Sequence, residues 1–181
     1  MNVTESDPTE PRPVTRRRAI GPERLDDLAR LCVNELDGLY RDAPAPESLE
    51  ALAGAPVGRM LTVRGPFDRP RSRGRVAALA RAAWFPWRGK SFSAFDAETG
   101  EGINRVRLLG ERFRFGLSFD RSAIDGRPCV LLDYDRPDNP WLIRQIRDEL
   151  RELRPGLFLG PAMWKTDHDP ALVLWFAIDA R

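Results

Sequence analysis

Apolar and polar residues alternate without interruption near the middle of the chain. In the stretch RFRFGLSFD, residues 112–120, the apolar positions are Phe113, Phe115, Leu117 and Phe119, and the residues between them are polar or glycine. A period of two is typical of a strand with one buried and one solvated face. Residues 112–120 are therefore predicted to form a strand whose phenylalanine row faces either the protein's own core or a bound molecule.

Several other segments are also predicted to be strands, and they are separated by short turns such as Asp125-Gly126. In the last of them both alternating sets of residues are apolar, which predicts a strand covered on both faces. Consecutive strands with short turns favour an antiparallel meander. These predicted strands cover residues 58–65, 90–96, 103–110, 128–135, 157–165 and 172–179.

A helical period appears at two longer segments. Residues 21–40 carry a leucine stripe that follows Pro22, and residues 138–153 carry apolar residues at three- and four-residue spacing after Pro140. Shorter helices are expected at residues 47–54 and 75–85.

These elements together predict a mainly β fold with some helix. A curled antiparallel sheet of about 7–9 strands closes into a barrel, here with N-terminal helices and one helix inserted before the last two strands. Residues 1–19 are rich in Pro, Thr and charge and are expected to form a disordered tail. Residues 20–181 are expected to form a single barrel domain.

The composition excludes some classes of function. The net charge is +2 and no long run of like charge occurs, so a nucleic-acid partner is not expected. No stretch is apolar enough for a membrane span or a signal peptide, which favours the cytoplasm. The excess of Arg, Ala and Pro indicates a GC-rich bacterial source and leaves two lysines, Lys90 and Lys165. Cys32 and Cys129 are expected to be small buried residues.

No cofactor or metal site is expected. His168 is the single histidine and lies between Asp167 and Asp169 in a predicted turn, where adjacent residues seldom converge on one ion. Phosphate-binding glycine loops and a nucleophile elbow are also missing from the sequence.

The stretch WRGKSF, residues 87–92, resembles small bacterial lipocalin-like (calycin-like) barrels of the GXWXG type. The segments LDYDRPDNP, GLFLGPAMW and LWFAID fit the same resemblance, which covers residues 54–181, although residues 54–60 contain the glycines of the motif without its Trp. The family has no assigned reaction. The resemblance implies a small barrel with an apolar ligand and carries over no catalytic residue.

The bulky residues of the predicted strands either fill the barrel or form the walls of an apolar pocket. Lys90 then has two interpretations: it binds a carboxylate or phosphate on the ligand, or it reaches solvent while Trp87 closes the barrel. The candidate ligand-binding residues are Trp87, Lys90, Phe92, Phe113, Phe115, Phe119, Tyr134, Trp164 and Trp175.

Asp133 and Tyr134 are the candidates for proton transfer. Asp133 lies in an apolar row, which predicts either a buried acid with a raised pKa or a partner for an arginine of a neighbouring element. Three hypotheses follow. The first is binding of a small hydrophobic molecule such as a fatty acid, isoprenoid or polyketide. The second is an acid–base enzyme, namely an isomerase, cyclase or lyase. The third is a module that forms a homodimer through its Trp-rich last strands.

Overall fold

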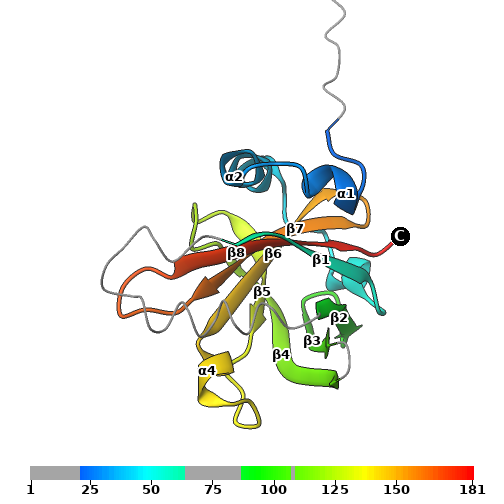
Figure 1. Cartoon of the computed structure of the whole chain (residues 1–181). Helices are drawn as coiled ribbons and strands as arrows, with labels where there is room; N and C mark the ends of the chain where they lie inside the picture. Colours follow the sequence, from blue (N-terminus) through cyan, green and yellow to red (C-terminus); the bar gives the residue numbers. More distant parts are fainter. Residues whose placement is uncertain (1–20, 64–86, 107–108) are drawn as a thin grey trace, which may run out of the picture.

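Eight antiparallel strands follow one another around a closed barrel, in which β1 also pairs with β8 (Figure 1). The computed structural model describes residues 21–63, 87–106 and 109–181. The prediction of a mainly β, antiparallel barrel is confirmed. The strands are β1 (Val57–Val63), β2 (Trp87–Ala94), β3 (Thr99–Val106), β4 (Gly110–Arg121), β5 (Pro128–Asp133), β6 (Ile146–Arg154), β7 (Leu157–Trp164) and β8 (Ala171–Asp179).

The alternating row of β4 faces the barrel interior. Phe115 and Leu117 are buried there, and Phe113 and Phe119 pack against the same interior core. The period of two thus identified both the strand and its buried face.

The described residues form four short helices beside the barrel. They are α1 (Leu25–Leu28), α2 (Val33–Asp42), the 3₁₀ helix η1 (Leu49–Leu52) and α4 (Trp141–Arg144). The single helix predicted over residues 21–40 is therefore divided into α1 and α2. The predicted tail, residues 1–19, and the predicted helix at residues 75–85 lie outside the described residues. None of the described helices has the length and apolar character needed to cross a membrane.

The helices α1 and α2 cover the outer side of β7 and β8, at the top of the view in Figure 1. Leu28 and Leu36 pack there with Leu159 and Trp175. The opposite face of β8 contributes Phe176 to the interior core. The prediction that the last strand is covered on both faces is confirmed. At one end of the barrel η1 adds Leu49 and Leu52 to the interior core. The backbone N–H of Leu49 donates a hydrogen bond to the Ala97 carbonyl in the β2–β3 turn.

The long helix predicted over residues 138–153 is wrong. Only α4 is helical, and β6 follows it. Asp148 and Leu150 of β6 face the interior, whereas Glu149 and Arg151 face outward and find buried polar partners of their own. The apolar spacing of this segment fits both periods, and the tertiary partners decide in favour of the strand.

The outward side chains of β6 attach α2 and the β4–β5 turn to the barrel. Glu149 accepts hydrogen bonds from the hydroxyls of Tyr40, at 2.8 Å, and Ser122, at 2.6 Å. Burial and the Glu149 charge raise the pKa of Tyr40 well above its usual value. Arg151 is fully buried and donates two hydrogen bonds to Asp125, at 2.8 and 2.6 Å, and one to the Tyr40 carbonyl. This polar cluster fixes the outer layer as specifically as the apolar contacts do.

The two cysteines differ in exposure. Cys129 is buried in β5, as expected, whereas Cys32 is exposed just before α2, contrary to expectation. Burial raises the pKa of the Cys129 thiol to about 12.

Replacing Arg151 with Met leaves Asp125 without its paired cation and the Tyr40 carbonyl without its donor. Because breaking a buried pair is costly, we expect the free energy of unfolding to fall by about 3–5 kcal/mol. Urea denaturation measures this change. The matched control Arg144→Met removes an exposed pair with Asp135 and should change stability by about 0.5 kcal/mol or less. Equal losses in the two variants would contradict the role assigned to Arg151.

Thiol labelling of the native protein with a disulfide reagent at pH 8 should modify Cys32 and spare Cys129. The thiolate is the reactive form, and Cys129 lacks both the thiolate and the access that labelling needs. In denaturant both thiols should react. Rapid native labelling of Cys129, located by peptide mass spectrometry, would show that β5 is not buried as described.

Candidate functional site

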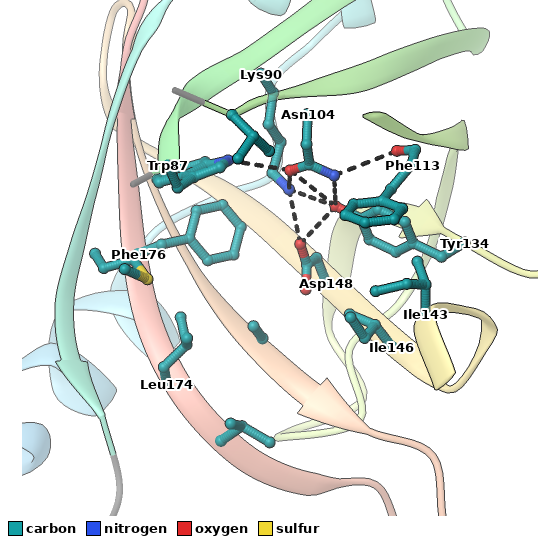
Figure 2. A pocket seen from close by; sticks show the side chains of 14 residues that line it. Trp87, Lys90, Asn104, Phe113, Tyr134, Ile143, Ile146, Asp148, Leu174 and Phe176 are labelled. Atoms are coloured by element: carbon teal, nitrogen blue, oxygen red, sulfur yellow. Dashed lines mark hydrogen bonds and ion pairs between the residues drawn. The ribbon is translucent and has the colours of Figure 1, made fainter. Parts of the chain in front are cut away.

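The barrel interior contains a cavity of about 170 Å³, formed by the described residues near α4 (Figure 2). Most of its lining is apolar. A few polar groups gather at one side of it, and they come from β2, β3, β6 and the residue that follows β5. The apolar lining includes Met60, Val106, Ile143, Ile146, Leu174 and Phe176, and the polar groups belong to Trp87, Lys90, Asn104, Tyr134 and Asp148.

Lys90 is at the centre of the polar group. Its side chain is 3% exposed, and its ammonium donates to Asn104 Oδ1 at 2.9 Å, to Asp148 Oδ2 at 2.9 Å and to the Tyr134 hydroxyl. The Nζ atom also lies 5.0–5.5 Å from the centroids of four aromatic rings, including those of Phe115 and Phe176. Burial lowers the pKa of Lys90, and the Asp148 charge opposes this shift. Because an ammonium has three hydrogens, all of its donor capacity is used within the protein.

Asn104 links Lys90 to β4. Its Oδ1 atom also accepts from the Trp87 indole at 3.1 Å, while its Nδ2 donates to the Tyr134 hydroxyl at 3.0 Å and to the Phe113 carbonyl at 3.3 Å. Phe113 has a φ of 62°, in the left-handed region, and it lies where the pairing of β3 with β4 shifts register. A bulge of this kind redirects backbone groups. Here the bulge includes Phe113, whose carbonyl accepts the hydrogen bond from Asn104.

Tyr134 completes the connection to Asp148. Its hydroxyl donates to Asp148 Oδ2 at 3.1 Å, and it accepts from Lys90 and Asn104. Burial, and next the Asp148 charge, raise the pKa of Tyr134 well above its usual value. The phenol therefore keeps its proton at neutral pH and acts as a donor to the carboxylate.

One polar atom of the network lacks a partner. Asp148 Oδ1 is buried and has no hydrogen-bond partner within residues 21–63, 87–106 and 109–181. In Figure 2 it points away from the dashed network that surrounds Oδ2. The mainly apolar lining of the cavity thus includes a residue, Asp148, with one buried carboxylate oxygen that has no partner in the described part of the chain.

The structure brings together only some of the residues expected at the site. Phe92 and Phe115 belong to the interior core, and Phe119 packs against it, but the three do not line the cavity. Trp164 packs against Val173, a lining residue. Trp175 lies on the outer face, with its ring 5.5 Å from Tyr40. The expected residues that line the cavity are Trp87, Lys90, Phe113 and Tyr134.

Asp133 lies on the outer surface. It is 45% exposed and pairs with Lys165 at 2.9 Å, so a partner on a neighbouring element is found, although it is a lysine rather than an arginine. The hypothesis of an acid–base enzyme required a carboxylate that faces the cavity. Asp133 does not meet this condition, whereas Asp148 and the other candidate, Tyr134, belong to the cavity lining. Trp164 and Trp175 of the last strands are buried within the chain, and a dimer through these strands stays a prediction. His168 is exposed in the β7–β8 turn, as predicted.

Sequence reasoning missed Asn104 and Asp148. The signal for Asp148 was its place between Ile146 and Leu150 at a spacing of two, which the helical interpretation of the segment concealed. Asn104 likewise lies between Gly102 and Val106 at a spacing of two. A polar residue in an inward row is recognisable as a site residue only when its partners are known.

Comparison with known proteins gives little beyond this geometry. No family model matches the chain, and no curated protein matches it. The crystal structure of a protein from Thermomonospora curvata is similar with a TM-score of 0.49 and 17% sequence identity, over 83% of this chain and 88% of that one.

Replacing Lys90 with Met leaves the Asp148 carboxylate buried without its cation. The free energy of unfolding should then fall by about 3–5 kcal/mol. The double variant Lys90→Met with Asp148→Leu should recover more than about half of this loss, because an ion pair is replaced by apolar groups. Chemical denaturation measures each variant. The control Lys165→Met should cost about 0.5 kcal/mol or less, and a double variant no more stable than Lys90→Met would contradict the pairing.

Proposed function

We propose that the barrel binds a small hydrophobic molecule in its interior cavity. The observation that carries this proposal is an apolar cavity of about 170 Å³ within the barrel core. Protein interiors are close-packed, and few voids exceed the size of a water molecule. An engineered apolar cavity of about 150 Å³ in another protein is large enough to bind benzene. The present cavity therefore has room for one compact hydrocarbon group.

The size of the cavity limits the class of guest. Pockets for drug-sized ligands usually measure about 300–1,000 Å³, so the cavity has room for only part of a long-chain fatty acid. A short isoprenoid or a single polyketide-type ring fits better. Lys90 also offers no free N–H to a fatty-acid carboxylate, since its three donors bind Asn104, Tyr134 and Asp148.

The aromatic residues take two roles in this proposal. Trp87, Phe113 and Phe176 form walls that contact the guest directly. Phe92 and Phe115 belong to the interior core without lining the cavity, and their rings meet edge to face with centroids 5.7 Å apart. The polar network orients the guest at one side of the cavity.

Filling the cavity tests the proposal. Ala162 lines the cavity, so Ala162→Leu places three more carbons inside it. We expect toluene to bind the wild type, measured by ligand-observed NMR, and to bind this variant at least about tenfold more weakly. The control Ala171→Leu makes the same change at an exposed position of β8 and should leave toluene binding unchanged.

Native mass spectrometry of freshly purified protein provides a second readout. A recurrent small adduct that is lost in Ala162→Leu would support the proposal. A failure of the wild type to bind toluene or any similar apolar ring would contradict it.

A further inference from the structure

The hydrogen bonds of the polar network indicate which chemical group of a guest could bind beside it. Lys90 uses three donors, and Asn104 uses both of its amide hydrogens and its oxygen. The Tyr134 hydroxyl donates once and accepts twice. Asp148 Oδ2 accepts twice, whereas Asp148 Oδ1 accepts none from the described residues although it is buried. Among the described residues, the network that borders the cavity therefore has one unused acceptor and no unused donor.

We propose that the guest is a small uncharged alcohol whose hydroxyl donates to Asp148 Oδ1 while its hydrocarbon body fills the apolar cavity. This inference rests on the proposed binding function and specifies the ligand class for the same site. A buried carboxylate oxygen without a hydrogen bond is costly, and a hydroxyl in the guest relieves that cost. Hydrogen bonds to charged groups are also stronger than those between neutral groups.

Charged guests are disfavoured at this position. The Lys90–Asp148 pair is electrically neutral as a unit, with its atoms 2.9 Å apart. A carboxylate guest would bring a second anion next to Asp148, and an ammonium guest would bring a second cation close to Lys90. Either guest would bury a net charge between apolar walls.

Guests that only accept hydrogen bonds are disfavoured for a different reason. A ketone or ether oxygen needs a donor, and the donors of Lys90, Asn104 and Tyr134 are committed within the protein. Its lone pairs would instead face those of Asp148 Oδ1. A plain hydrocarbon fits the walls but leaves that oxygen unsatisfied.

A set of six-membered rings tests this ranking on the wild-type protein. The set comprises cyclohexanol, cyclohexanone, methylcyclohexane, cyclohexylamine and cyclohexanecarboxylate, with binding followed through the indole N–H signal of Trp87 in NMR spectra. Cyclohexanol should bind about tenfold or more tightly than methylcyclohexane, which corresponds to one hydrogen bond to a charged group. The ketone and both charged rings should bind more weakly than cyclohexanol.

The outcomes separate the two proposals. Equal affinities for the three neutral rings would overturn the alcohol inference and leave the binding function in place. Binding by none of the rings would overturn both. Tighter binding of the amine or the carboxylate would overturn the inference, because it would show that a charged group is accommodated.

Replacing Asp148 with Asn gives a sharper version of the test. Lys90 and Tyr134 both donate to Oδ2, so the amide oxygen should keep that place and the NH₂ group should replace Oδ1. The acceptor in the cavity becomes a donor, and we expect cyclohexanone to bind this variant better than cyclohexanol. A folded variant that keeps the wild-type ranking would overturn the inference. If the variant does not fold, the wild-type ranking decides alone.

Asp133→Asn is the matched control. It makes the same chemical change on the outer surface, where Asp133 pairs with Lys165. The wild-type preference for cyclohexanol should persist in this variant. A changed ranking here would contradict the assignment of the preference to Asp148.

Discussion

The polar network inside the barrel depends on a buried ion pair between Lys90 of β2 and Asp148 of β6. In an eight-strand barrel whose strands follow in sequence order, β2 and β6 lie on opposite sides, so the contact between Lys90 and Asp148 spans the interior. A charge is tolerated in such surroundings only when it is paired and hydrogen-bonded. Asn104 and Tyr134 complete the hydrogen bonds, and the network they form lies at one side of the apolar cavity.

The strand β6 makes polar contacts on both the inner and the outer face of the barrel. Its inward Asp148 belongs to the cavity, and its outward Glu149 and Arg151 attach α2 and the β4–β5 turn. Polar contacts are directional, so they fix the position of β6 together with the apolar packing. The placement of one carboxylate oxygen at the cavity therefore depends on contacts on both sides of the same strand.

The sequence predicted the barrel well, because an alternating row such as that of β4 needs only local information. The segment 138–153 failed, since its apolar residues satisfy two periods and the choice depends on Lys90, which is 58 residues from Asp148. Trp87, Lys90, Phe113 and Tyr134 were predicted as site residues from their chemistry. Trp175 lies elsewhere, because both faces of β8 are apolar and alternation alone does not say which one faces inward.

The most direct test of this account is a crystal structure of the protein with cyclohexanol. The account predicts the ring within the barrel, among Trp87, Phe113 and Phe176, and its hydroxyl oxygen about 2.5–3.0 Å from Asp148 Oδ1. A ring bound only on the outer surface would contradict the assignment of the cavity. A ring within the barrel whose hydroxyl points away from Asp148 would contradict the role of the carboxylate.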